Sequence, residues 1–360
     1  MPHQRLLLKM NYYGIRNILP WVKDFLSLRK QCVIIDGVHS KYVTVLSGLP
    51  QGTVLAALLF LIFINDLPET VLESFTGVYC DDTLIAREIS VKSDAVKLQD
   101  DLNNIFEWTK LWGMKFNIGK CVFMTVTNKT KPIMNNYHIN NEPLSKKEMI
   151  KYLGVNIDSK LTFNNHIKEK CKKATTVLNM LKRNLYFAPR SVKTKAYQAC
   201  VLPIIEYASS CWSPTSDKQK SSLEMIHHNG AKFASNIYPK SGKFEQFSIH
   251  KILQDLNWNT LEERRINSRL IMTYKIINGH VILDSNLMPK VDHQRPNRKC
   301  NEVKVGYQNQ ITEPPWKIDV VKSTFFYAAP TLWNNNVTPM QASAPSIDAF
   351  KQHLKNSRKK

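Results

Sequence analysis

The stretch SGLPQGTVLAALLFLIFINDLPE, residues 47–69, decides the fold more than any other part of the chain. It opens as a turn rich in glycine and proline and continues as an unbroken apolar run, Val54 to Ile64, which we predict to be a buried helix. Asn65-Asp66-Leu67-Pro68 should end that helix, because proline cannot continue its hydrogen bonding. The run is far shorter than the roughly 20 residues that a helix needs to cross a bilayer.

The loop that precedes this helix offers groups suited to a nucleotide. Gly48 and Gly52 let the backbone approach a ligand closely, and Pro50 stiffens the turn. Gln51 can present its amide to a base or a sugar. The N–H groups at the start of the following helix favour negative charge beside the loop.

Two adjacent carboxylates follow further along the chain. Phe75–Cys80 and Thr83–Arg87 are predicted to form a strand pair with Asp81 and Asp82 at its tip. Such a pair can ligate Mg2+, which binds few carboxylates together with substrate phosphates. Aspartate is also common in ordinary turns, so the pair alone says little. Its combination with the glycine-rich loop and the apolar helix indicates a nucleotide-handling site.

The remaining pattern alternates helices and strands over the first half of the chain and becomes helical and basic after it. Helices are predicted at His3–Asn11, Asn17–Leu28 and Ser93–Leu111, a hairpin of Gln31–Gly37 and Lys41–Leu46 joined by Val38-His39-Ser40, strands at Met114–Asn117, Val122–Thr127 and Ile150–Ile157, and a hairpin at Tyr137–Leu144.

The charge balance favours a polyanionic partner. Lysine and arginine number 50 against 29 acidic residues, a formal charge of +21. Such an excess is tolerated most easily beside nucleic acid, although a merely basic or ribosome-associated protein is the plainer interpretation. The seven cysteines are scattered singly without zinc spacing, which predicts a reduced intracellular compartment, cytoplasm or nucleus.

These motifs resemble those of reverse transcriptases from non-LTR retrotransposons of the jockey/CR1-like clade. Residues 47–69 resemble motif B, YCDDT (79–83) resembles motif C, EWTKLWGMKFNIGKC (107–121) resembles motif D, and KYLGVNID (151–158) resembles the motif E hairpin. Residues 166–214 resemble the thumb and post-thumb region of these elements, and the segments TFFYAAPTLWNNN (324–336) and SIDAFKQHLK (346–355) resemble their closing segment.

The resemblance implies an α+β fold of the right-hand polymerase type. Residues 1–163 would form part of a palm, an antiparallel sheet backed by helices. Residues 164–288 would form a helical, basic thumb and post-thumb region, and residues 289–360 a C-terminal segment of no predicted topology. The implied reaction is RNA-directed DNA synthesis with two Mg2+ ions, or Mn2+ in their place, acting on an RNA template, a DNA primer and deoxynucleoside triphosphates.

The resemblance also implies roles for particular residues. Asp81 and Asp82 would be the catalytic metal ligands, and Lys120 a general acid or else a solvated lysine. The substrate contacts would be Tyr79, Ser47, Gly48, Pro50, Gln51 and Gly52, and the primer grip would be Tyr152, Leu153 and Gly154, or else an ordinary strand turn. Phosphates would be neutralised by Lys168, Lys170, Lys172, Lys173, Lys182, Arg183, Arg190, Lys193 and Lys195, although a charge run also suits a solvated face.

The pattern departs from the family at its start. The family's motif A aspartate precedes a Pro-His pair, and here Pro2-His3 directly follow Met1. We therefore expect a truncated enzyme that is inactive alone, because a two-metal site needs that carboxylate to bridge its ions. The alternative is a non-catalytic nucleic-acid-binding remnant. A group II intron-type maturase shares motifs B and C, but the region after motif E favours the retrotransposon family.

Overall fold

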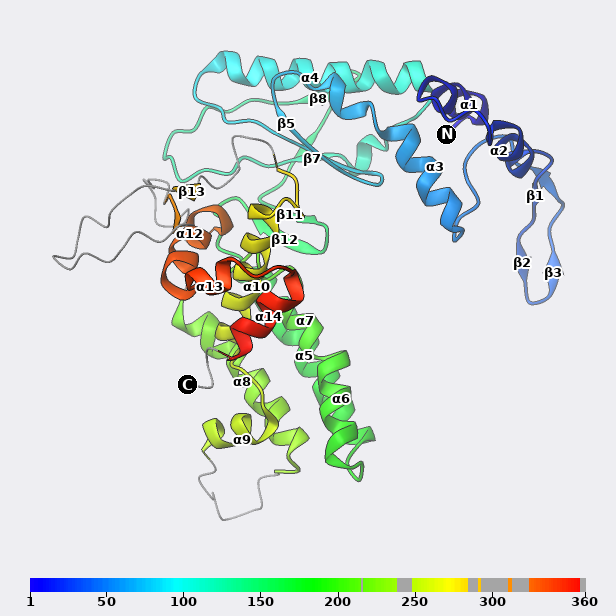
Figure 1. Cartoon of the computed structure of the whole chain (residues 1–360). Coiled ribbons are helices and arrows are strands. Elements are labelled where there is room, and N and C mark those ends of the chain that lie inside the picture. The colour runs from blue at the N-terminus through cyan, green and yellow to red at the C-terminus, as the bar shows by residue number, and fades with distance from the viewer. Residues whose placement is uncertain (215, 238–247, 284–290, 293–309, 313–323, 357–360) are drawn as a thin grey trace. The chain divides into compact units, whose positions relative to one another are not determined.

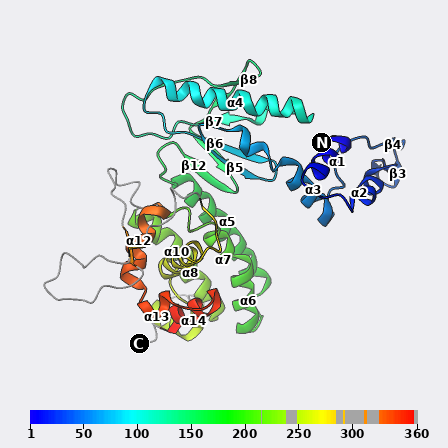
Figure 2. The same ribbon diagram turned by 45° about the horizontal axis from the view of Figure 1, so that its top comes forward.

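A computed structural model of the chain describes residues 1–214, 216–237, 248–283, 291–292, 310–312 and 324–356 (Figures 1 and 2). The chain divides into two compact units, Met1–Glu148 and Met149–Lys360. Helices and strands are mixed in the first unit, and helices dominate the second. At this coarse level the structure agrees with the predicted α+β class.

The first unit contains four α-helices, two short 3-10 helices and five strand pairs. The helices are α1 (His3–Tyr12), α2 (Leu19–Leu26), α3 (Val54–Ile64), η1 (Leu67–Thr70), α4 (Lys92–Trp112) and η2 (Ile118–Lys120). The antiparallel pairs join β1 (Lys30–Gln31) to β4 (Val43–Thr44), β2 (Ile34–Ile35) to β3 (Val38–His39), β5 (Phe75–Tyr79) to β6 (Asp82–Ala86), and β8 (His138–Ile139) to β9 (Glu142–Pro143). β7 (Val122–Phe123) pairs in parallel with β10 (Ser145–Lys146).

The first hairpin turns two residues earlier than the sequence pattern predicts. Asp36 and Gly37 both have positive φ, 49° and 82°, which is the combination that a two-residue hairpin loop requires. Val38 and His39 are therefore part of strand β3, and the predicted connection at residues 38–40 is wrong. The strand predicted at Met114–Asn117 is also wrong, since the structure assigns no strand there.

Helix α3 begins and ends at the residues that the sequence predicts. Thr53 caps its start, because the Thr53 hydroxyl accepts a hydrogen bond from Ala56 N at 3.3 Å. Its burial differs from the prediction, since Leu59 and Phe63 are buried while Val54 is 93% exposed and Leu58 is 54% exposed. Every residue of the helix is apolar, so the pattern could not show that only one face would be covered. None of the described helices is both long and apolar enough to span a membrane.

A buried lysine joins three helices of the first unit. Lys9 of α1 is enclosed, and its Nζ donates to Phe63 O at 2.6 Å and to the Asp66 carboxylate. The ammonium lies over the rings of Phe63, Trp108 and Trp112 at 4.8, 4.6 and 3.9 Å from their centroids. Burial lowers the pKa of Lys9. These contacts satisfy a carbonyl at the end of α3 and fix α1 and α4 against it.

In the described part of the second unit, a hairpin of two four-residue strands is followed by a set of packed helices. Its described elements are β11 (Met149–Tyr152), β12 (Val155–Asp158), α5 (Asn164–Asn184), α6 (Arg190–Cys200), α7 (Leu202–Glu206), α8 (Asp217–Ala234), α9 (Ile249–Leu256), α10 (Leu261–Ile277), β13 (Val291–Asp292), β14 (Gln310–Ile311), α12 (Phe325–Asn336), α13 (Pro339–Ala342) and α14 (Ile347–Asn356). The strand predicted at Ile150–Ile157 is therefore divided by a turn.

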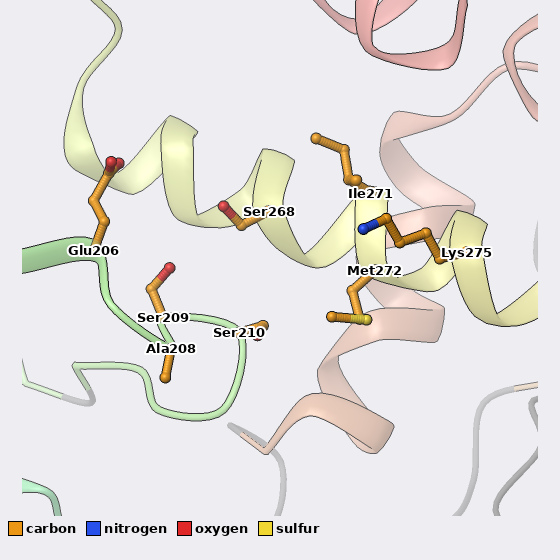
Figure 3. Close-up of a pocket in the computed structure, with 8 residues that line it drawn as sticks. All are labelled: Glu206, Ala208, Ser209, Ser210, Ser268, Ile271, Met272 and Lys275. Atoms are coloured by element: carbon orange, nitrogen blue, oxygen red, sulfur yellow. The ribbon is translucent and has the colours of Figure 1, made fainter. Parts of the chain in front are cut away.

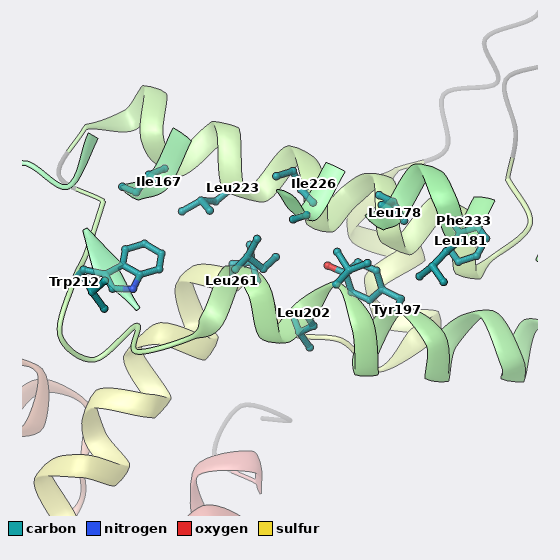
Figure 4. Packing of buried hydrophobic residues seen from close by; sticks show 14 residues of the cluster. Ile167, Leu178, Leu181, Tyr197, Leu202, Trp212, Leu223, Ile226, Phe233 and Leu261 are labelled. Atoms are coloured by element: carbon teal, nitrogen blue, oxygen red, sulfur yellow. The ribbon is translucent and has the colours of Figure 1, made fainter. Parts of the chain in front are cut away.

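Two hydrophobic clusters organise this unit around α10. The larger one gathers Leu178, Tyr197, Trp212, Leu223 and other side chains from α5 to α8 with Leu261 at the start of α10 (Figure 4). The second one joins the other face of α10 to α12 and α14, and its buried members include Leu270, Tyr274, Trp333 and Phe350. The sequence pattern did not predict the topology of the C-terminal helices. They pack on α10, the helix that also contacts α5 to α8.

Candidate functional site

The two adjacent aspartates lie at the tip of a hairpin, as the sequence predicts. Tyr79 and Asp82 form the last strand pair of β5 and β6, and Cys80 and Asp81 form the loop between them. Cys80 adopts a positive φ of 53°. The side chains of Asp81 and Asp82 are exposed. Both carboxylates therefore face solvent at the hairpin tip.

Helix α4 holds this hairpin at both ends. The buried Asp101 carboxylate, on a residue that is 1% exposed, accepts hydrogen bonds from Leu72 N at 2.8 Å and Glu73 N at 3.3 Å, just before β5. Arg87, just after β6, pairs with Asp94 at 3.2 Å. Hydrogen bonds from the backbone lower the pKa of Asp94, which favours its charged form. The contacts with α4 therefore fix the outer ends of β5 and β6, the two strands that lead to the aspartates.

The glycine-rich loop is anchored at its start and open at its end. Gly48 N donates to Met1 O at 2.8 Å, and His3 Nε2 donates to Gly48 O at 2.7 Å. Gly48 and Gly52 have φ of 88° and 83°, and no atom lies within 4 Å of a Cβ built on either. Gln51 is exposed. The loop can therefore be approached from outside, as a substrate-binding loop requires.

The predicted nucleotide-site residues all lie in the first unit, but the glycine-rich loop and the two aspartates do not bond to each other directly. Across residues 1–148, which the structure describes completely, no hydrogen bond or ion pair joins the loop at 47–52 to Asp81 or Asp82. Ser47 makes an isolated bridge with Pro2. Lys120 ends η2 with an exposed side chain, and within residues 1–148 no hydrogen bond or ion pair connects it with the aspartates.

The donor set at the hairpin tip suits a hard cation only in part. Two exposed carboxylates provide oxygen ligands of the kind that Mg2+ prefers. In the part of the chain that the structure describes, no group of three or more acidic, histidine or cysteine side chains could hold a metal ion. Asp81 and Asp82 could thus supply part of a metal site, and the remaining oxygens would come from elsewhere.

The predicted primer grip is the turn of the β11–β12 hairpin. Tyr152 ends β11 and pairs with Val155, while Leu153 and Gly154 form the turn with φ of 44° and 78°. The hairpin is bound to α5, because Asn156 N donates to His166 Nδ1 at 3.2 Å. The sequence prediction placed this hairpin with residues 1–163, whereas its contacts place it in the second unit.

Helix α5 presents most of its predicted phosphate-binding residues to solvent. Lys168, Lys172, Lys173 and Arg183 are exposed. Lys182 is half-buried, and burial together with Lys232 lowers its pKa. A row of exposed cations along one helix suits the phosphates of a nucleic-acid backbone.

One predicted phosphate-binding residue is in the core instead. Lys193 is 1% exposed, and its Nζ donates to Tyr186 O at 2.6 Å and to Asn236 Oδ1. It also lies 5.6 Å from the ring centroid of Phe233. The prediction that Lys193 contacts nucleic acid is wrong, because its ammonium group is already enclosed and hydrogen-bonded within the helical unit.

A small pocket in the second unit contains none of the predicted residues. It has a volume of about 250 Å³ and is lined on one side by the segment after α7 and on the other by α10 (Figure 3). Its acidic residue, Glu206, forms an ion pair with Arg264, whose Nε and Nη2 lie 2.5 and 2.8 Å from the carboxylate. This pair raises the pKa of Arg264. The lining of the pocket therefore combines serine side chains with a carboxylate whose charge Arg264 balances.

Residues 1–157 match the protein family described as reverse transcriptase (RNA-dependent DNA polymerase). The predicted resemblance to reverse transcriptases is therefore confirmed for this segment. The chain is similar to the probable RNA-directed DNA polymerase from transposon BS of Drosophila melanogaster, with 25% identity over 84% of this chain and 33% of that protein. It is also 32% identical, over 57% of its length, to the RNA-directed DNA polymerase from mobile element jockey of Drosophila funebris, of which it covers 24%. The chain thus spans a third or less of these relatives.

Proposed function

We propose that this chain is the catalytic-palm and thumb part of an RNA-directed DNA polymerase that copies an RNA template from a DNA primer. The observation that carries the proposal is the exposed Asp81-Asp82 pair at a hairpin tip, within a segment that matches the reverse transcriptases. Residues 1–163 would form the palm portion, and the basic helices of residues 164–288 would form the thumb portion.

In this proposal the chain's own residues bind and orient the substrates. Asp81 and Asp82 would hold divalent cations, which would stabilise negative charge on the triphosphate and on the attacking primer oxygen. The loop of Ser47, Gly48, Pro50, Gln51 and Gly52 contacts the incoming nucleotide and the template base, and Tyr79 packs under the primer end. Lys120, the last residue of η2, would donate a proton to pyrophosphate.

A second candidate function is supported by the hairpin itself. It supplies two carboxylates, and a two-metal reaction needs at least one more to bridge the ions. With the cations of α5 exposed, the chain could hold an RNA–DNA hybrid without copying it. The two functions therefore differ in nucleotide incorporation and agree in binding.

The first prediction concerns Asp81→Asn. We expect residues 1–360 alone to bind an RNA–DNA primer–template without extending it. Joined behind the region that precedes the match in the jockey polymerase, the same chain should extend the primer with Mg2+ or Mn2+. There Asp81→Asn should lower incorporation by roughly 100-fold or more, the order seen when preorganised charge is removed from an active site. Hybrid affinity should change little.

Gel-resolved primer extension beside fluorescence anisotropy separates the outcomes. Extension by residues 1–360 alone that disappears with Asp81→Asn would mean that another carboxylate of this chain completes the site. Extension by the joined protein that survives Asp81→Asn would contradict the polymerase assignment of the hairpin.

The second prediction concerns the salt dependence of hybrid binding. Replacing Lys168, Lys172 and Lys173 by glutamine should reduce the slope of log affinity against log salt by about 2 to 3, since each phosphate contact contributes about 0.9. The matched control replaces Lys218, Lys251 and Lys355, three lysines with exposed side chains on α8, α9 and α14. Equal slopes for both triple variants would show that α5 has no special role in binding.

A further inference from the structure

The turn of the β11–β12 hairpin has a backbone conformation that needs support. Leu153 has a φ of 44° and Gly154 a φ of 78°. The left-handed conformation is unfavourable for a leucine, and it persists only where the surroundings fix it. The turn contains the predicted primer grip, so what holds it matters for any contact that it makes.

Tyr207, at the end of α7, holds the turn in two ways. Its hydroxyl donates a hydrogen bond to Leu153 O at 2.9 Å. Its ring also packs closely against the next residue, because a Cβ built on Gly154 would be 3.1 Å from Tyr207 Cε1. Glycine at position 154 thus allows both the positive φ and the close approach of the ring.

Contacts with buried side chains of the second unit hold Tyr207 in place. Its carbonyl accepts a hydrogen bond from Trp212 Nε1 at 2.9 Å, and the Trp212 side chain is completely buried. Trp212 packs edge-to-face with His166, with ring centroids 5.0 Å apart. His166 Nδ1 in turn accepts from Asn156 N, on the strand that leaves the turn. The contacts form a closed circuit from the hairpin through α5 and the segment after α7 back to the hairpin.

A cation accompanies this arrangement. Lys170 Nζ lies 5.3 Å from the centroid of the Tyr207 ring. Burial lowers the pKa of Lys170, Glu169 acts in the opposite direction, and Lys173 and Lys151 make smaller contributions that lower it. Lys170 thus places a cation against the aromatic ring that contacts the turn.

We propose that Tyr207 is a positioning residue that fixes the Leu153–Gly154 turn and thereby the primer terminus, an assignment that rests on the proposed function for its second half. Tyr207 lies outside residues 1–157, so a residue of the helical unit would control an element of the matched domain. The hydroxyl bond sets the position of the Leu153 carbonyl, and the ring prevents the turn from moving toward α7.

Hydrogen exchange of residues 149–158 tests the first half of the inference in the free protein. Tyr207→Phe should speed exchange at the turn by about 5-fold, the effect of one hydrogen bond of typical strength, and Tyr207→Leu should speed it more. The matched control is Tyr274→Phe, which removes another tyrosine hydroxyl that donates to a carbonyl, Ala344 O at 2.5 Å. That variant should leave exchange at the turn unchanged.

A primer–template carrying a fluorescent base at the primer 3′ end tests the second half. Tyr207→Phe should weaken the signal that reports a fixed primer end. The affinity for a blunt hybrid should stay unchanged, whereas a general loss of structure would lower that affinity as well. Unchanged exchange at the turn in the Tyr207 variants overturns the inference, and faster exchange with an undisturbed primer end overturns its second half. Should the wild-type chain fail to fix a primer end at all, the primer-grip assignment fails, while faster exchange would still show that Tyr207 holds the turn.

Discussion

Alanine at position 230 is expected to destabilise the helical unit by roughly 3 kcal/mol, at the upper end of the usual cost of overpacking. A Cβ on Gly230 of α8 would lie 2.1 Å from Tyr197 Cε2. The Tyr197 ring cannot move aside cheaply, because it is completely buried, stacked on Trp258 with centroids 4.8 Å apart, and hydrogen-bonded to His227. The gain of about 1 kcal/mol from replacing glycine in a helix is too small to compensate.

Urea unfolding followed by circular dichroism measures this effect. Ser221→Ala, at an exposed position of the same helix, should change the midpoint little. The cost of Gly230→Ala should also shrink in a Tyr197→Leu background, because the smaller side chain relieves the overlap. An equal cost in both backgrounds would show that the tyrosine ring is not the obstacle.

The second large effect is a loss of stability in mild acid. Burial lowers the pKa of His227 from 6.5 to about 4, and burial lowers the pKa of His166 to about 4 as well. Between pH 6.5 and 4 the unfolded chain therefore binds protons that the folded chain does not. The free energy of unfolding should fall as the pH drops through this window, by up to about 3 kcal/mol for His227, and the contribution of His227 should level off below it.

The hydrogen bonds agree with this direction. His227 Nε2 donates to Asn259 O at 3.0 Å, so its Nδ1, 2.9 Å from the Tyr197 hydroxyl, is an acceptor in the neutral ring. His166 Nδ1 accepts from Asn156 N, which a protonated ring could not do. Urea midpoints from pH 7 to 4 measure the change, and His227→Gln should flatten the profile. A wild-type profile that is already flat would contradict the burial argument.

Local sequence signals predicted those elements whose ends are set by their own residues. Thr53 and the Asn65-Asp66-Leu67-Pro68 segment mark the two ends of α3, and β-branched residues on both sides of Asp81-Asp82 predict the hairpin. The turn at Asp36-Gly37 also had a signal, since Asp-Gly is a favoured hairpin loop. Our prediction gave more weight to the strand-like character of residues 31–37 and missed it.

The features that escaped prediction depend on contacts between distant residues. Lys193 looks like the exposed lysines of α5 in sequence, and only the packing of α6 on α8 reveals that Asn236 and Tyr186 surround it. The role of Tyr207 likewise depends on a turn more than fifty positions earlier in the chain. No pattern of spacing or charge marks either of them, because neither interaction repeats along a helix or strand.

The contacts around His166 and Trp212 also limit where the chain can be shortened for expression. The family match ends at residue 157, inside β12, which runs from Val155 to Asp158. A protein ended there would keep Asn156 but lose the histidine that accepts its N–H and the Glu169 carboxylate 2.6 Å from its amide. Anyone who expresses the matched segment by itself should therefore expect a frayed hairpin, and the sensible place to cut lies before Met149 or beyond the helices that carry it.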